Sequence, residues 1–180
     1  GSAYVFSFHA AAGSRLSFAT MFVQSNDWFY APDAGGLALW DTAGNPVSGD
    51  VTSQIRLWDA GTEIDQTPGE GADQAPRQAG PNTGAVDPDN TVRQVSAAGV
   101  PPVSSVVRVT VTPGANGLFT VRIENVSAGA SLPTPLAPGV FVVHTDGEPL
   151  FTPGEADRGD RRSLRGRVRR ADRRDRLDRP

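Results

Sequence analysis

Residues 103–126 read Val-Ser-Ser-Val-Val-Arg-Val-Thr-Val-Thr-Pro-Gly-Ala-Asn-Gly-Leu-Phe-Thr-Val-Arg-Ile-Glu-Asn-Val. Apolar and polar side chains alternate on both sides of the turn-forming segment 113–117. Alternation with a period of two predicts two strands, 103–112 and 118–126, joined as an antiparallel hairpin. This stretch therefore favours a β fold in which each strand buries one face.

Shorter apolar runs elsewhere in the chain have the length of strands and end in turn-forming residues. The strands expected from these runs cover residues 4–8, 15–23, 37–40, 51–58, 91–96 and 139–144. No long helical pattern separates them, and 20 glycines and 15 prolines indicate a chain rich in turns. We predict an all-β fold, an antiparallel β-sandwich, with a long polar loop at residues 64–91.

Carboxylates stand at the expected ends of two strands. The first motif is Ser-Asn-Asp-Trp at 25–28, and the second is Leu-Trp-Asp-Ala-Gly-Thr-Glu at 57–63. Asp59 and Glu63 flank a small turn-forming insert, so both can face one point, and Asp27 joins them if the strand ends are neighbours. Oxygen ligands without His or Cys suit Ca²⁺. The alternative is that these acids cap turns and stay solvated.

These two motifs resemble those of the spondin domain, the module of F-spondin and mindin that also occurs alone in bacterial secreted proteins. The resemblance covers residues 3–157, with supporting matches at 20–23, 49–52, 119–121 and 149–152. It implies a β-sandwich similar to the calcium-dependent lipid-binding domains and one Ca²⁺ held by Asp27, Asp59 and Glu63. Animal members usually have Asp at the position of Glu63 and carry disulfides. The absence of Cys here indicates the bacterial version.

Charge divides the chain into a β-sandwich domain at residues 1–157 and an arginine-rich tail at 158–180. The first part holds 16 acidic residues against 6 arginines, and the second holds 11 arginines against 4 aspartates. An acidic body suits divalent cations and repels nucleic acid, so no specific nucleic-acid partner is expected. We expect the tail to be disordered; the alternatives are a solvated cationic arm and a segment that docks on the acidic body.

The sequence contains few signatures of an enzyme. It has no Cys and lacks the Gly-x-Ser-x-Gly and His-Glu-x-x-His motifs, and its two histidines, His9 and His144, are isolated in strand-like segments. No apolar run is long enough to span a membrane, and the given chain shows no signal peptide. We expect a secreted, extracellular or periplasmic, non-catalytic calcium-binding adhesion module with a protein or surface-glycan partner. A glycan-binding or glycan-active protein and a structural subunit of a surface assembly are the alternatives.

Overall fold

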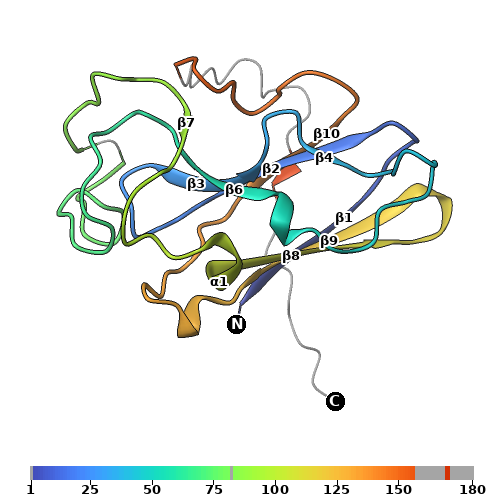
Figure 1. The fold of residues 1–180 in the computed structure, drawn as a ribbon, viewed down its shortest axis with the longest axis horizontal. Helices are drawn as coiled ribbons and strands as arrows, with labels where there is room; N and C mark the ends of the chain where they lie inside the picture. Colours follow the sequence, from blue (N-terminus) through green and yellow to red (C-terminus); the bar gives the residue numbers. More distant parts are fainter. Residues whose placement is uncertain (1, 82, 157–168, 171–180) are drawn as a thin grey trace.

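The computed structural model describes residues 2–81, 83–156 and 169–170, and it contains two antiparallel sheets (Figure 1). The first sheet has the order β1-β9-β8-β5, from β1 (Ala3–His9), β9 (Leu118–Asn125), β8 (Val107–Pro113) and β5 (Gly49–Asp50). The second has the order β11-β10-β2-β3-β6-β7, from β11 (Arg169–Arg170), β10 (Val140–His144), β2 (Arg15–Met21), β3 (Trp28–Pro32), β6 (Ile55–Asp59) and β7 (Arg93–Gln94). The short strand β4 (Leu37–Ala38) pairs with β2. The predicted antiparallel β-sandwich is confirmed.

The hairpin expected from residues 103–126 is β8 paired with β9. Val109 lies opposite Ile123 and Val111 opposite Val121, and all four side chains are buried. The first part of the expected strand is instead the short helix α1 (Val103–Val106). Its turn is favoured because both the N–H and the hydroxyl of Ser105 donate to the carbonyl of Pro102, at 2.9 and 2.8 Å. The two strands are connected through a 3₁₀ turn, η2 (Ala115–Gly117).

The strand expected at residues 51–58 also begins later than predicted. A 3₁₀ turn, η1 (Thr52–Gln54), comes first, and β6 starts at Ile55. Asp50 Oδ1 accepts a hydrogen bond from the Thr52 N–H at 2.8 Å, which favours the turn, and Thr52 Oγ1 accepts one from the Val109 N–H at 2.9 Å. The chain crosses from β5 in the first sheet to β6 in the second within these residues.

The core lies between the two sheets and includes aromatic side chains of β3 and of Phe22, the residue that follows β2. Trp28 and Tyr30 are buried, and the Trp28 ring stacks on Phe22 with a centroid distance of 6.2 Å. These aromatic side chains therefore belong to the core. Their burial fixes the backbone at the start of β3, next to Asp27.

The structure places no helix or strand in the described residues 60–81 and 83–92, which include the long loop expected at 64–91. They form the left-hand end of the molecule in Figure 1, beside the turn that joins β2 to β3. A further 3₁₀ turn, η3 (Ser127–Gly129), follows β9. None of the helices in the described part of the chain has the length or apolar character needed to cross a membrane.

Both histidines lie in strands and contact backbone carbonyls. His9 Nδ1 lies 3.2 Å from the carbonyl oxygen of Asn116. His144 lies between Ser17 Oγ and the carbonyl oxygen of Asp146, at 2.9 Å from each. The expectations for the arginine-rich tail at 158–180 fall outside the described residues, apart from Arg169–Arg170, whose backbone pairs with β10.

Candidate metal centre

The turn between β2 and β3 positions Asp27. Phe22 N–H donates to the carbonyl of Trp28 at 2.9 Å, and the buried hydroxyl of Ser25 donates to the carbonyl of Phe22 at 2.6 Å. The same hydroxyl accepts a hydrogen bond from the Trp28 N–H at 3.1 Å. The turn is therefore closed by side-chain as well as backbone hydrogen bonds, and it brings Asp27 to the end of β3 that pairs with Asp59.

Asp59 is the last residue of β6, directly opposite Trp28 in the register of the sheet. Its Oδ1 accepts a hydrogen bond from the Gly61 N–H at 2.7 Å. Gly61 has a φ of +68°, and a Cβ atom there would lie 2.6 Å from the carbonyl oxygen of Thr91. Only glycine fits this position without strain, because it tolerates both the positive φ and the close backbone.

One carboxylate oxygen links the two sequence motifs. Asp27 Oδ2 accepts hydrogen bonds from the Thr62 N–H at 2.6 Å, from the Thr62 hydroxyl at 2.7 Å and from the Glu63 N–H at 3.1 Å. The turn after β6 thus folds back onto the turn before β3. The two strand ends are therefore neighbours, which is the condition under which Asp27 can join Asp59.

Three aspartates converge at this point: Asp27, Asp59 and Asp65. One carboxylate oxygen from each lies within 4.8 Å of the other two. Asp65 comes from the long loop, and its Oδ1 accepts a hydrogen bond from Trp28 Nε1 at 2.5 Å. We call these three residues the aspartate triad. It contains two of the three residues expected from the sequence.

Glu63, the third expected ligand, is buried beside the triad but is not a member of it. Its Oε1 accepts a hydrogen bond from the Gly84 N–H at 2.7 Å. Glu63 also forms an isolated antiparallel bridge with Val86. In this structure Glu63 therefore ties the two sides of the long loop together. Its role as a metal ligand stays a prediction.

Two buried oxygens of the triad have no hydrogen-bond donor. They are Asp27 Oδ1 and Asp59 Oδ2. Arg93 Nη2 lies 2.5 Å from Asp59 Oδ2 and forms an ion pair with it, although the direction of the N–H groups does not give a hydrogen bond. Buried carboxylate oxygens normally have donors or a cation, so Asp27 Oδ1 is available to a ligand, whereas Asp59 Oδ2 already faces the guanidinium of Arg93.

The charges of the triad disfavour one another. Burial, the largest cause, and the negative charges of Asp27 and Asp65 together raise the pKa of Asp59 to about 7, although the Gly61 N–H and Arg93 lower it. Burial is also the main cause that raises the pKa of Asp65, with a contribution from the charge of Asp27. Asp65 is the most exposed of the three aspartates and Asp59 the most buried, so the rise in pKa matters most at Asp59. A cation between the three carboxylates would relieve this repulsion.

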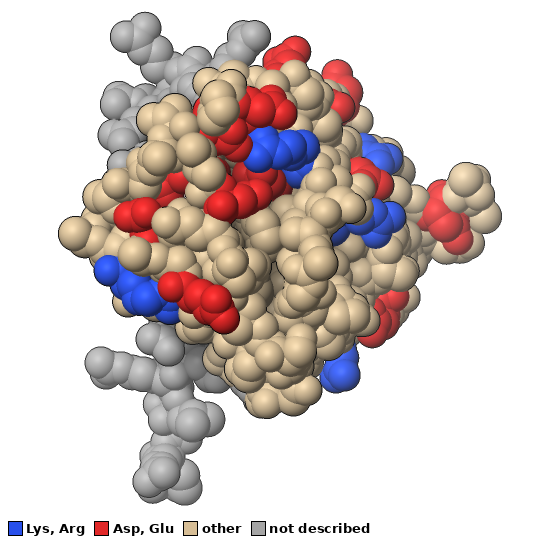
Figure 2. All heavy atoms as spheres, turned by 60° about the vertical axis from the view of Figure 1, so that its left-hand side comes forward, with Lys and Arg blue, Asp and Glu red and all other residues tan. Residues whose placement is uncertain are grey.

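Hydrogen bonds fix the long loop, both within the loop and to the β2–β3 turn. The Gln66 N–H donates to Asn26 Oδ1 at 3.1 Å, which joins the loop to the β2–β3 turn. The fully buried Gln74 donates from Nε2 to the carbonyl of Thr67 at 2.8 Å, and its Oε1 accepts from the Gly69 N–H at 2.9 Å. Figure 2, in which this end of the molecule is turned forward, shows acidic side chains gathered around a basic one on the surface.

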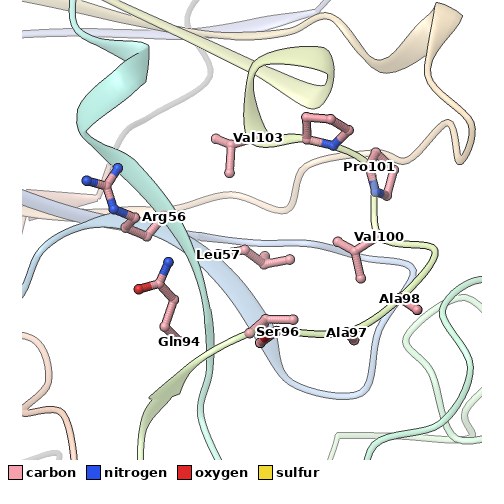
Figure 3. A pocket seen from close by; sticks show the side chains of 11 residues that line it. Arg56, Leu57, Gln94, Ser96, Ala97, Ala98, Val100, Pro101 and Val103 are labelled. Carbon is pink, nitrogen blue, oxygen red and sulfur yellow. The ribbon is translucent and has the colours of Figure 1, made fainter.

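A groove of about 440 Å³ lies along β6, away from the carboxylates (Figure 3). Leu57 projects toward Val100 from β6, and the segment that follows β7 curves around it. Arg56 and Gln94 supply polar groups at one side. No acidic residue lines the groove, so the chemistry of the triad does not extend into it.

Asp65 and Arg93 are the members of this centre that the sequence motifs did not reveal. Asp65 stands two residues after the second motif, and an extended chain would place it on the same side as Glu63. That spacing is a usable signal. Arg93 reaches the triad because β7 pairs with β6, and no local sequence pattern predicts this pairing.

Comparison with known proteins gave no relatives: the chain matches no family model, no curated protein and no solved structure. Fold and site together define an all-β protein with three aspartates that could hold a metal ion. Membership of the spondin family stays a prediction from the motifs.

Proposed function

We propose that the protein binds one Ca²⁺ at the aspartate triad and acts as a secreted, non-catalytic adhesion or interaction module. The observation that carries the proposal is the convergence of three carboxylates within 4.8 Å, with Asp27 Oδ1 buried and without a hydrogen-bond donor. Leaving such an oxygen buried and unpaired costs free energy, and a bound cation removes that cost.

The chemistry of the donors favours Ca²⁺ over other common metals. The triad offers only carboxylate oxygens, and the described residues place no histidine and no cysteine beside it. Hard cations prefer such ligands, and Ca²⁺ accepts the irregular geometry that loops provide, whereas Mg²⁺ demands a regular octahedron. Asp27 and Asp65 lie on loop segments, which supports the less demanding ion.

The low exposure of Asp59 supports binding rather than catalysis. Its side chain is only 2% exposed, so a sugar ring cannot reach this carboxylate. A glycosidase needs two carboxylates that both contact the glycosidic bond. The raised pKa of Asp59 would suit a general acid, but without access to substrate it has nothing to protonate.

The adhesion role rests on the resemblance of the two motifs to spondin domains and on the position of the site among end loops. Recognition in β-sandwich proteins concentrates in such loops, because they vary while the sheets hold them in place. A bound ion would add a further link between the β2–β3 turn and the long loop and so fix the surface offered to a partner protein or a surface glycan. In the alternative function, a structural subunit of a surface assembly, the bound ion would fix the same end loops.

The test is thermal unfolding of the full chain in Ca²⁺, in Mg²⁺ and in chelator. We expect the melting temperature to rise in Ca²⁺ and to change little in Mg²⁺. Asp65→Asn should abolish the response. Asp33→Asn is the matched control, because Asp33 is 72% exposed at the opposite end of β3 and should leave the response intact. A melting temperature that is the same with Ca²⁺ and with chelator would rule out the site.

The adhesion role is tested separately, by binding of the protein to cells or extracellular matrix. We expect binding to fall in chelator and in Asp59→Asn and to survive in Asp33→Asn. Binding that is unaffected by both chelator and Asp59→Asn would contradict the role of the end loops while leaving the metal site itself untouched. Turnover of a sugar substrate would support the enzyme instead.

A further inference from the structure

Arg93 is surrounded by oxygen atoms, as a bound cation would be. Its Nη2 lies 2.5 Å from Asp59 Oδ2 and 2.6 Å from Asp87 Oδ2. Its Nη1 donates to the carbonyl of Asp89 at 2.7 Å and to the carbonyl of Thr91 at 3.3 Å. Asp89 Oδ2 is 3.7 Å from the same nitrogen. Three carboxylates and two carbonyls thus surround one guanidinium.

The backbone holds this arrangement in place. Arg93 belongs to β7 and lies directly opposite Asp59 of β6 in the register of the sheet. The segment before it is closed by two more hydrogen bonds: Asp89 N–H donates to Asp87 Oδ1 at 2.9 Å, and the Thr91 hydroxyl donates to Asp89 Oδ1 at 2.8 Å. The guanidinium is therefore positioned by strand pairing and an ordered loop, and its charge is permanent at any physiological pH.

Asp59 is shared between Arg93 and the aspartate triad. One of its oxygens pairs with the guanidinium, and the same carboxylate lies within 4.8 Å of Asp27 and Asp65. A divalent ion in the triad would therefore lie close to a fixed positive charge. The two cations would repel each other and compete for the same carboxylate.

We propose that Arg93 is a tethered cation that offsets part of the negative charge of the triad when no metal is bound and lowers the affinity of the triad for Ca²⁺. This inference rests on the proposed calcium site. With all three carboxylates ionised, the triad alone carries a charge of −3, and the triad together with Arg93 carries −2. Because ligand charge sets the affinity of calcium sites, Arg93 keeps ion binding weak and reversible.

Asp87 gives the guanidinium a second partner. When a metal takes Asp59, Arg93 keeps its ion pair with Asp87 and its hydrogen bond to the carbonyl of Asp89. The exchange is then a local change at one carboxylate and requires no unfolding of β7. The metal-free protein stays folded because the tethered charge already offsets part of the repulsion within the triad.

The experiment is calorimetric titration of the full chain with Ca²⁺, combined with melting in chelator. Arg93→Gln should bind Ca²⁺ about tenfold more tightly than the wild type, which equals about 1.4 kcal/mol. In chelator the same variant should melt at a lower temperature, because the triad has lost its counter-charge. Arg56→Gln is the matched control: Arg56 lies on β6, and its charged partner is the exposed Asp33, 3.9 Å away.

Arg93→Met keeps the aliphatic stem and replaces Arg93→Gln if that variant does not fold. Unchanged or weaker Ca²⁺ binding in the charge-removing variant overturns the inference while leaving the proposed site standing. Binding that is absent in wild type but present in the variant supports the tethered cation. Absence of binding in both overturns the calcium site together with this inference.

Discussion

Asp59→Asn should change the stability of the protein in opposite directions with and without Ca²⁺. The substitution removes one charge from the triad but keeps the shape of the side chain. Its amide oxygen can still accept the hydrogen bond from the Gly61 N–H, which measures 2.7 Å in the wild type. Without metal, the ionised Asp59 is unfavourable, since it is buried and near two other acids. With Ca²⁺ bound, the same charge attracts the ion.

The size of the effect follows from the geometry. The pKa of Asp59 rises from 3.8 to about 7 in the folded protein, so its ionisation at high pH opposes folding by at most about 4 kcal/mol. One like charge at 4.8 Å contributes about 0.9 kcal/mol in a water-like medium and about 3.5 kcal/mol at an effective dielectric constant of about 20. Loss of the ion pair with Arg93 opposes this gain. We expect a net stabilisation of about 1–2 kcal/mol in chelator, or roughly 2–8 °C in melting temperature.

The assay is thermal unfolding of wild type and Asp59→Asn at pH 7.5, once in chelator and once in millimolar Ca²⁺. We expect the variant to melt above the wild type in chelator and below it in Ca²⁺, with no response of the variant to the ion. Asp33→Asn provides the baseline for removal of an exposed carboxylate. A variant that is destabilised equally in both conditions would refute the reasoning, because Asp59 would then act only through hydrogen bonding.

Three further predictions follow from the same contacts. In chelator, Asp59 keeps its proton in the folded wild type over a pH range in which the unfolded chain has already released it. The free energy of unfolding should therefore fall as pH rises from about 4 to about 7. In a series of melts at different pH, Asp59→Asn should flatten this dependence. Gly61→Ala should lower the free energy of unfolding, measured by chemical denaturation, by about 2–4 kcal/mol, because the new Cβ atom would meet the backbone of Thr91. Gly44→Ala is the control: Gly44 has a similar φ but open space around it, so the loss should be about 1 kcal/mol. Glu63→Gln should change the Ca²⁺ affinity less than Asp65→Asn in a calorimetric titration, since Glu63 Oε1 is engaged by the Gly84 N–H; the reverse order would make Glu63 the third ligand.

The hairpin was predictable from the sequence because its signal is local. Alternating side chains and a turn segment specify β8 and β9 without any knowledge of the rest of the chain. The starts of the strands were not predictable in the same way. The turn at Thr52 has one local cause, the hydrogen bond from its N–H to Asp50 two residues earlier, but the hydrogen bond that its hydroxyl accepts comes from Val109, 57 positions away in the chain. A contact of that range has no trace in the neighbouring residues.

The candidate site was predictable in part for a similar reason. Asp27 and Asp59 stand at strand ends, and strand pairing brings them together. Asp65 joins them through a hydrogen bond from the indole of Trp28, which lies 37 positions earlier. Arg93 depends on the register between β6 and β7. Both contributions depend on tertiary contacts: spacing after the second motif gives a signal for Asp65, but nothing in the motifs points to Arg93.

The most direct test of the calcium site is a crystal structure of the full chain grown in Ca²⁺, with anomalous diffraction data to identify the ion. A single anomalous peak between Asp27, Asp59 and Asp65, with carboxylate oxygens at about 2.3–2.6 Å from it, is the expected result. Crystals that contain Ca²⁺ in their medium but show no anomalous peak at the triad would contradict the proposed function.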